Sequence, residues 1–350
     1  MKAVLDGVQR WRHELSNCLH SCIGVALTRH GIDALVVLGS RWQFYYRPGD
    51  LRREEYFWPC PPGVSLANTL MPYHPISSRW HQPADAAQGW QQVRERILAG
   101  EPALVAVDNF WLPFRPAYQD VHSNHLVAVY GFDDEADLVW INDGVPPAFD
   151  GPMAGKHLDA SRDSDNPIVH DRDLFFTANP IGNKWLSIDL DPDAPAPPDL
   201  ATMLRTNVRD FLDPEPVDGY VGLGGIEAFL RDAADRLAIG EAIAEETFVV
   251  AGTAVASAAL HASALRALAS QHDNPLLAEV ALAVDRVAHH WTAIRILVNT
   301  IEQSEVDRLR YRTDQLMADC GRALAEVSRV ADALAQEGQQ TCRPRFTASS

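Results

Sequence analysis

The sequence has few cysteines and no long uninterrupted hydrophobic run. Five cysteines among 350 residues are an odd number with irregular spacing, which argues against a disulfide framework and against a cysteine-type zinc site. Residues 1–7 lack the apolar core of a signal peptide. The longest apolar stretch, Phe248–Leu260, contains Gly and Thr and is too short to span a bilayer. We therefore expect a protein of the reducing cytoplasm that does not insert into a membrane.

Positive charge is also scarce. Lys and Arg number 30 against 47 Asp and Glu, which gives a formal net charge of −17. Such a chain lacks the concentrated positive surface that a phosphate backbone requires, so no nucleic-acid partner is expected, whereas a cationic amine would be attracted. An acidic partner protein would need a local basic patch. Arg41, Arg47, Arg52 and Arg53 form one candidate patch, and a solvated loop is the alternative.

Motifs for cofactors are absent from the sequence. It contains neither a G-x-x-x-x-G-K-[ST] nor a G-x-G-x-x-G phosphate loop, and no internal repeat. The second half lacks the Glu-x-x-His pairs with which helical bundles hold carboxylate-bridged metals. We therefore expect no metal and no bound cofactor. The acids and histidines of that half are Glu241, Glu245, Glu246, His261, Glu279, His289, His290 and Glu302.

Length and composition predict two domains. A proline-rich stretch at residues 191–200 favours an extended linker, which separates residues 1–190 from residues 201–340. The first part mixes helical and strand-like segments, which indicates an α+β domain with a helix packed on an antiparallel sheet. The second part is helical and rich in alanine, which predicts an all-α helical bundle. Residues 341–350 are expected to form a disordered tail.

Hydrophobic periodicity gives the expected elements of both parts. Glycines and an Asn-Pro pair mark the turns between helices of the second part. The expected helices are 18–29, 226–238, 241–270, 275–301 and 304–335, and the expected strands are 44–46, 104–108, 125–130, 138–142 and 184–188.

Cys18 stands at the start of the first expected helix. The apolar positions after it fall at helical spacing, and Ser16 or Asn17 can serve as its N-cap. A thiol in the first turn of a helix faces unpaired backbone amides, which lower its pKa and favour the nucleophilic thiolate. Cys18 is therefore the candidate nucleophile.

His125 and Asp143 lie on a predicted β-hairpin. His125 opens one strand, an acidic turn follows Gly131, and Asp143 closes the second strand. Because the turn folds the two strands together, we expect Asp143 to return beside His125. A carboxylate in that place can accept the ring N–H and fix the tautomer and orientation of the imidazole. His125 is thus the candidate base.

Each of these three residues also has an ordinary structural explanation. Cys18 can be a small buried hydrophobe, His125 a hydrogen-bonded core histidine, and Asp143 a turn residue in Asn-Asp-Gly. Their order and their settings at a helix start, a strand start and a strand end are together typical of a papain-type nucleophile site. The combination therefore favours covalent acyl chemistry.

Five segments add a family resemblance. They are residues 18–21 (Cys-Leu-His-Ser), 42–46 (Trp-Gln-Phe-Tyr-Tyr), 102–108, 112–114 (Leu-Pro-Phe) and 125–133. On these segments, residues 17–147 resemble the N-terminal domain of the butirosin biosynthesis protein H family. The resemblance implies a papain-like fold and acyl transfer to an amine from a thioester on the phosphopantetheine arm of a carrier protein. It also implies Cys18 as nucleophile, His125 as base and Asp143 as orienting acid.

The sequence departs from that family just before the cysteine. A histidine is expected there, and Asn17 stands in its place. Asn17 is a candidate oxyanion donor through its side-chain amide, and the alternative is that it has no catalytic role. The backbone N–H of Cys18 is the expected first donor. Arg12 occupies the position at which papain-like enzymes carry an oxyanion glutamine.

Five residues are candidates for substrate binding. Asp108 ends a predicted strand and can hold the ammonium group of an acceptor, although a loop cap is an equal alternative. Two aromatic clusters flank the proposed site and are core residues by default. Aromatic side chains of these clusters that line the cleft would bind an acyl chain and exclude water. The candidates among them are Trp42, Tyr45, Phe110 and Trp111.

The sequence thus predicts a cysteine-dependent, amide-forming acyltransferase of natural-product biosynthesis. Its expected partners are an acyl or peptidyl carrier protein and a small-molecule amine. The same residues would serve a papain-like peptidase or thioesterase, since only the position of the amine and the exclusion of water distinguish transfer from hydrolysis. A non-catalytic papain-fold binding protein is the remaining alternative, and a homodimer stays open.

Overall fold

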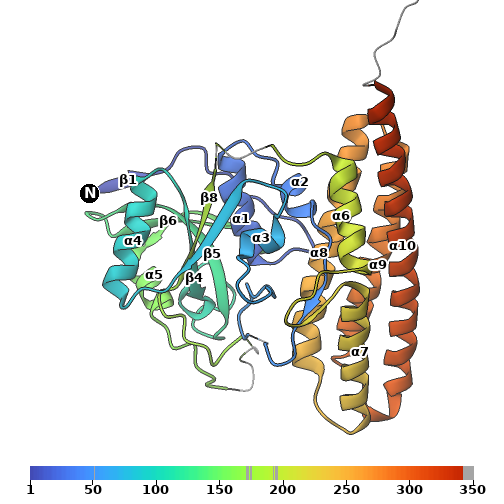
Figure 1. Cartoon of the computed structure of the whole chain (residues 1–350). Helices are drawn as coiled ribbons and strands as arrows, with labels where there is room; N and C mark the ends of the chain where they lie inside the picture. Colours follow the sequence, from blue (N-terminus) through green and yellow to red (C-terminus); the bar gives the residue numbers. More distant parts are fainter. Residues whose placement is uncertain (51, 171–172, 174–175, 192, 194–195, 342–350) are drawn as a thin grey trace, which may run out of the picture. The chain divides into compact units, whose positions relative to one another are not determined.

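The computed structural model describes residues 1–341 except 51, 171–172, 174–175, 192 and 194–195 (Figure 1). The chain divides into two compact units. We call residues 1–38 and 49–194 the α+β unit, and residues 39–48 together with those from 195 onward the helical unit. Residues 342–350 of the predicted tail lie outside the described residues, as does part of the predicted linker.

The α+β unit is built on a seven-stranded sheet in which every pairing is antiparallel. Six strands follow one another across it, and the seventh, β1 (Lys2–Val4), pairs with the far end of β5. The sheet confirms the α+β prediction for this part of the chain. In spatial order the six strands are β3 (Ile76–His81), β8 (Trp185–Leu190), β4 (Ala103–Asp108), β5 (Asn124–Asp133), β6 (Leu138–Asp143) and β7 (Phe149–Ala154).

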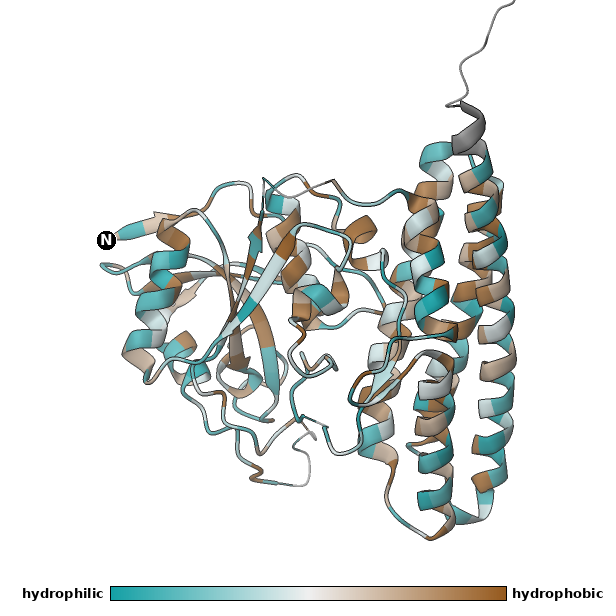
Figure 2. Cartoon of the chain, in the orientation of Figure 1, coloured by the Kyte–Doolittle hydropathy of each residue, from teal (hydrophilic) through white to brown (hydrophobic). Residues whose placement is uncertain are grey.

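Helices cover both faces of this sheet. In Figure 1, α4 (Ala86–Leu98) and α5 (Gly155–Arg162) lie on one side, and α1 (Cys18–Arg29) and α3 (Leu66–Leu70) on the other. The central strands β4 and β5 consist almost entirely of buried residues, and Figure 2 colours them as hydrophobic. A short helix, α2 (Ala34–Gly39), ends at the boundary between the units, and a 3₁₀ turn, η1 (Asn109–Trp111), follows β4.

The β5–β6 hairpin has the register that brings its open end to α1. Val129 pairs with Ile141, and a β-bulge separates this pair from the pairing of Gly131 with Trp140. Both strands are longer than the sequence predicted. β5 runs on through Asp133 before the turn, and β6 includes Asp143 as its last residue. Their open end carries the start of β5 and the end of β6.

The helical unit contains the five longer helices of the second half. A two-stranded antiparallel pair, β2 (Tyr45–Tyr46) with β9 (Tyr220–Val221), completes it. Each of the four predicted helices is present within a few residues of its expected bounds. The helices are α6 (Leu200–Leu212), α7 (Gly222–Ala238), α8 (Ala244–His272), α9 (Pro275–Leu297) and α10 (Val306–Thr341), with a 3₁₀ turn, η2 (Gln303–Glu305), before the last.

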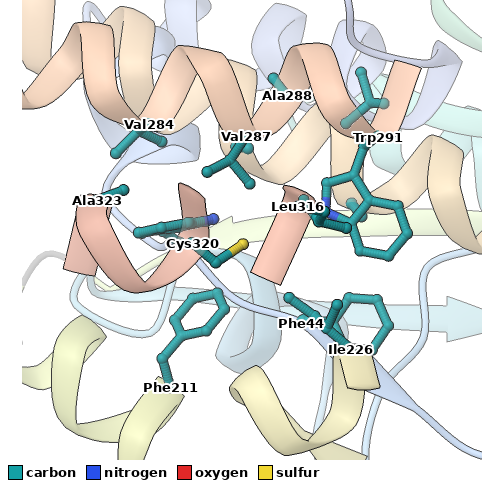
Figure 3. Packing of buried hydrophobic residues seen from close by; sticks show 14 of the residues in the cluster. Phe44, Phe211, Ile226, Val284, Val287, Ala288, Trp291, Leu316, Cys320 and Ala323 are labelled. Carbon is teal, nitrogen blue, oxygen red and sulfur yellow. The ribbon is translucent and has the colours of Figure 1, made fainter. Parts of the chain in front are cut away.

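Residues 39–48 pack inside the helical unit, although they precede most of the α+β unit in the sequence. Trp42 is 2% exposed and lies 4.6 Å from the ring of Phe211. Phe44 stacks on Trp291 at 5.5 Å in the core of the unit (Figure 3). The sequence predicted that this segment belongs to the first domain. The contiguous division into residues 1–190 and 201–340 therefore does not include the assignment of residues 39–48 to the helical unit.

Helix α8 is long and apolar enough, by length and composition, to cross a membrane. This differs from the expectation based on Phe248–Leu260, because the helix extends beyond that stretch at both ends. However, 83% of its most apolar window is buried among other residues of the protein. That burial is typical of the core helix of a helical bundle.

Candidate functional site

Cys18 is the first residue of α1, as the sequence predicted. Asn17 is the N-cap, with extended backbone angles, and its side-chain oxygen accepts from the backbone N–H of His20. The same oxygen accepts from His20 Nδ1 at 2.7 Å. Cys18 itself is 0% exposed, so its thiol lies beneath other side chains.

His125 and Asp143 are in direct contact, which confirms the geometric prediction made from the hairpin. His125 Nε2 donates to Asp143 Oδ2 at 3.0 Å, and both side chains are buried. Arg115 Nη1 donates to the same carboxylate oxygen at 3.1 Å. The second carboxylate oxygen accepts from the backbone N–H of Val145. These contacts fix the orientation of the Asp143 carboxylate and, through it, the imidazole ring.

Glu55 is the third side chain beside Cys18 and His125, and the sequence did not predict it. One carboxylate oxygen of Glu55, one ring nitrogen of His125 and the sulfur of Cys18 lie within 4.8 Å of one another. Glu55 Oε2 accepts from His125 Nδ1 at 2.6 Å, on the opposite side of the ring from Asp143. The Glu55 side chain is 23% exposed, whereas that of His125 is 0% exposed. Glu55 therefore separates the Cys18–His125 pair from solvent.

The segment that carries Glu55 is fixed at several points. The backbone oxygen of Glu55 accepts from Asn17 Nδ2 at 3.4 Å. The neighbouring Glu54 forms an ion pair with Lys184 at 2.7 Å. Three residues after Glu55, the ring of Trp58 meets the ring of His20 edge to face at 4.9 Å. Residues 54–58, which we call the covering segment, thus lie over the start of α1.

Burial and charge set the protonation states in the site. Burial, followed by the charge of Glu55, raises the pKa of Cys18 to about 11, although His125 opposes the change. Burial alone would lower the pKa of His125, but Asp143, Glu55 and Cys18 outweigh it and raise that pKa well above its usual value. For Asp143 burial acts upward, yet His125 and Arg115 hold its pKa below the usual range.

The thiol is therefore not activated in this conformation. The sequence predicted that the helix N-terminus and a nearby His would lower the pKa of Cys18, and this prediction is wrong for the structure as it stands. The physical reason is first that the sulfur is fully buried, and second that Glu55 adds a negative charge beside it. The imidazolium of His125 is paired with two carboxylates rather than with a thiolate.

Asn17 holds both ends of its side-chain amide in internal contacts. Its oxygen accepts from His20, and its nitrogen donates to the backbone oxygen of Glu55. The nitrogen points at the carbonyl of another residue, which is the kind of contact that an oxyanion donor makes with a substrate. Asn17 is thus placed next to Cys18 with a donor group aimed at the covering segment.

Asp108 is part of the scaffold. The side chain is 0% exposed, and its carboxylate accepts from the backbone N–H groups of Phe110 and Ser123 and from the hydroxyl of Ser164. His122 Nδ1 contacts it at 2.7 Å. Its acceptor positions are filled by the chain itself, which favours the loop-cap alternative over the binding of an acceptor amine.

The four aromatic candidates fall into different units. Trp42 and Tyr45 are buried residues of the helical unit, where Tyr45 donates its hydroxyl to the backbone oxygen of Asp218. Phe110 and Trp111 form η1 in the α+β unit, and Phe110 stacks on His122 at 4.1 Å. The four residues are therefore divided between the two units, with two in each.

A cleft of about 410 Å³ lies next to the covering segment. Tyr56 and Trp58 form part of its wall, and Trp80 lies 5.1 Å from the ring of Tyr56. Arg52 and Arg79 bring positive charge to the same cleft. Its other lining residues are Glu54, Phe57, Cys60, Pro61, Pro62, Gly63, Val64, Ser65, Leu66 and Ser78.

The four arginines of the predicted basic patch are divided between the two units. Arg41 and Arg47 belong to the helical unit and pair with Asp210 and Asp218. Arg52 belongs to the α+β unit, with Asp50 3.7 Å away.

The structure brings potential metal ligands together at a place that the sequence did not indicate. Among the described residues, the cluster with three or more suitably close His, Cys, Asp or Glu side chains is Cys18, Glu55 and His125, and it lies in the α+β unit. The acids and histidines of the helical unit that the sequence singled out are not part of it.

Comparison with known families supports the resemblance seen in the sequence. Residues 17–144 match the family model of butirosin biosynthesis protein H, N-terminal. The match begins at the N-cap of α1 and ends just after Asp143, so it contains Cys18, Glu55 and His125. A comparison with curated proteins gave no match.

Proposed function

We propose that this protein is a cysteine-dependent acyltransferase that forms amide bonds in natural-product biosynthesis. The observation that carries the proposal is the placement of His125, which is bonded to Asp143 on one side and lies within reach of the Cys18 sulfur on the other. A binding protein has no need of a buried thiol, imidazole and carboxylate in this order. The family match of residues 17–144 supports a biosynthetic role.

The first step of the proposed reaction loads the acyl group on Cys18. Once Glu55 has moved away and the proton that it stabilises on His125 has gone to solvent, neutral His125 takes the thiol proton, and the thiolate attacks the carbonyl carbon of a thioester. The C–S bond to the donor breaks, and its sulfur leaves as a thiol with the proton returned by His125. The first-turn amides of α1 and the side-chain amide of Asn17 are placed to stabilise the oxyanion, once the Glu55 carbonyl has left Asn17.

The second step transfers the acyl group to an amine. The amine nitrogen attacks the acyl-enzyme, His125 accepts a proton from the nitrogen, and Cys18 leaves as the thiol after receiving that proton. Asp143 keeps its negative charge throughout and stabilises the imidazolium that forms twice in the cycle. The products are an amide and the free enzyme.

The donor and acceptor follow from the chemistry of the surroundings. The aromatic cleft beside the covering segment suits the arm and acyl chain of a thioester carried on phosphopantetheine, and Arg52 and Arg79 suit its phosphate. The net charge of −17 favours a cationic amine as acceptor. We place the reaction in the cytoplasm, with an acyl or peptidyl carrier protein as donor.

Intact-protein mass spectrometry tests the proposal. Wild type and Cys18→Ala are mixed with a panel of acyl thioesters, and amines are then added. We expect a mass increase equal to one acyl group on wild type alone, discharged faster by amines than by water. Cys320→Ala serves as the matched control, since Cys320 is a buried thiol of the helical unit, outside the site.

Two other outcomes have defined meanings. An adduct on Cys18 that water discharges as fast as amines do would favour a peptidase or thioesterase with the same residues. No adduct with any donor, at a range of pH values that includes the raised pKa of Cys18, would favour a non-catalytic binding protein.

A further inference from the structure

We infer that Cys18, His125 and Glu55 form a binding site for Zn²⁺, and that the metal closes the proposed active site reversibly. The binding itself goes beyond the proposed function, whereas the inhibition rests on it. The three donors are a thiol, an imidazole and a carboxylate, with one atom of each within 4.8 Å of the others. Zn²⁺ prefers this mixture of sulfur, nitrogen and oxygen ligands.

The spacing of the donor atoms suits a tetrahedral ion. Bonds of about 2.0–2.3 Å place the ligand atoms about 3.3–3.8 Å apart, which is inside the 4.8 Å limit of this cluster. Glu55 Oε2 and His125 Nδ1 are closer, at 2.6 Å, because they share a hydrogen bond. A rotation of the Glu55 side chain, which is 23% exposed, makes room for the ion between them.

Asp143 prepares His125 to act as a ligand. It accepts from Nε2, which holds a proton on that nitrogen and leaves Nδ1 facing Glu55. A carboxylate behind a ligating histidine is the usual outer-shell partner in zinc sites, where it fixes the tautomer and raises the basicity of the ring. Arg115, in turn, fixes the carboxylate of Asp143.

Charge supports a divalent cation rather than an empty site. Ionised Cys18, which is buried, and Glu55, which is 23% exposed, would place two negative charges together. Binding exchanges protons for metal: the thiol proton of Cys18 and the proton that Nδ1 shares with Glu55 go to solvent, and Zn²⁺ takes their place. No electrons move, and the fourth ligand position is left for water.

Equilibrium metal binding to the full chain tests the inference. Metal-free protein is titrated with Zn²⁺, and Co²⁺ is used as an optical probe, because a thiolate-to-cobalt charge-transfer band reports a sulfur ligand. We expect one site per chain and the charge-transfer band in wild type. Cys18→Ala should abolish the band, whereas Cys320→Ala, at a buried thiol of the helical unit, should keep it.

Glu55→Gln distinguishes the three-donor site from a cysteine–histidine pair alone. We expect its Zn²⁺ affinity to fall at least ten-fold. Glu101→Gln is the matched control, because Glu101 also pairs with a histidine, at 2.9 Å from His30, and has a similar side-chain exposure of 24%. Unchanged affinity in Glu55→Gln, or a cobalt–thiolate band that survives Cys18→Ala, would overturn the inference.

Failure of the zinc site and failure of the proposed function are separable. The metal titrations need no substrate, so they give the same answer whether or not an acyl-enzyme forms. If wild type forms the acyl-enzyme, equimolar Zn²⁺ should stop its formation and a chelator should restore it. Acylation at an unchanged rate in the presence of bound Zn²⁺ would contradict the proposed closure.

Discussion

At the scale of single residues, burial and the charge of Glu55 together disfavour the thiolate of the nucleophile. Its carboxylate contacts His125 and lies beside Cys18, and the pKa of the thiol is raised to about 11 mainly by burial and then by this charge. An active enzyme therefore requires Glu55 to move away, to be neutralised or to be paired by a cationic substrate. Under the proposed function, the carboxylate would link the entry of a substrate to the formation of the thiolate.

Glu55→Gln should make Cys18 more reactive. Removal of a negative charge next to the sulfur lowers the pKa of Cys18, because that charge disfavours the thiolate. The rate of alkylation of wild-type Cys18 should rise with pH up to about 11, and the curve for Glu55→Gln should lie at lower pH. Alkylation followed by peptide mapping measures the two curves, with Glu101→Gln as the control. Identical curves would show that Glu55 does not govern the thiol.

Asp143→Asn should cost much more activity than stability. In a Ser–His–Asp triad the equivalent change lowers kcat about 10⁴-fold, because it leaves the imidazole in the wrong tautomer. We expect a loss of similar order in acyl transfer. The stability cost should be about 1–3 kcal/mol, since Arg115 loses a charged hydrogen-bond partner.

Asp134→Asn provides the surface control for this experiment, because Asp134 forms an ion pair with Arg94 at the exposed hairpin turn. Transfer rates and urea unfolding curves are measured for both variants. Transfer at the wild-type rate in Asp143→Asn would remove Asp143 from the mechanism.

At the scale of secondary-structure elements, the site depends on a close approach between the β6 end and α1. A Cβ atom on Gly144 would lie 2.6 Å from the backbone oxygen of Trp11 and 3.3 Å from the Cβ of Ser21. Only glycine allows the chain to pass so near the helix that carries Cys18. The position of Asp143 is thereby tied to that of α1.

Gly144→Ala should therefore destabilise the protein and reduce acylation of Cys18. Overpacking against a backbone atom costs about 1–3 kcal/mol, and any shift of the chain moves the adjacent Asp143. Gly321→Ala is a matched control: its Cβ would meet nothing within 4 Å in the helix α10, so we expect a gain of up to about 1 kcal/mol. Chemical unfolding and acylation rates measure both, and equal stability of the two variants would contradict the prediction.

The sequence predicted the elements whose residues repeat with a clear period. The start of α1, the β5–β6 hairpin and the long helices α8 to α10 follow from such patterns. Strand β7 was missed, because Phe149–Ala154 contains Gly and Pro, which are tolerated at a sheet edge. The covering segment was also missed, since Glu55 lies in a loop without periodicity, far in sequence from both Cys18 and His125.

The sequence did not predict which unit every residue belongs to, and the reason is different. The Trp-Gln-Phe-Tyr-Tyr segment at residues 42–46 is typical of a strand, but its sequence does not indicate which hydrophobic core it joins. The structure gives it to the helical unit, where Ser257 Oγ bonds both the backbone N–H and the backbone oxygen of Gln43. Long-range packing of this kind has no local signature.

At the scale of the whole molecule, residues 39–48 make the helical unit dependent on the N-terminal part of the chain. Phe44→Ala should cost about 3–5 kcal/mol, because it removes a buried ring that stacks on Trp291. Tyr220→Ala should cost much less, since Tyr220 is 49% exposed. Urea unfolding followed by the helical circular-dichroism signal measures both, and a Phe44→Ala curve that overlies wild type would refute the dependence.

The exchange of residues 39–48 also bears on how such a gene can be recombined. The chain passes between the two units near residues 38, 48 and 194, so no single cut in the gene separates one complete unit from the other. A swap of everything after residue 195 would leave Trp42, Phe44 and Tyr46 without the helices that enclose them. We therefore expect the two units to be inherited as a pair, with the α+β unit and the helical unit changing together over evolution.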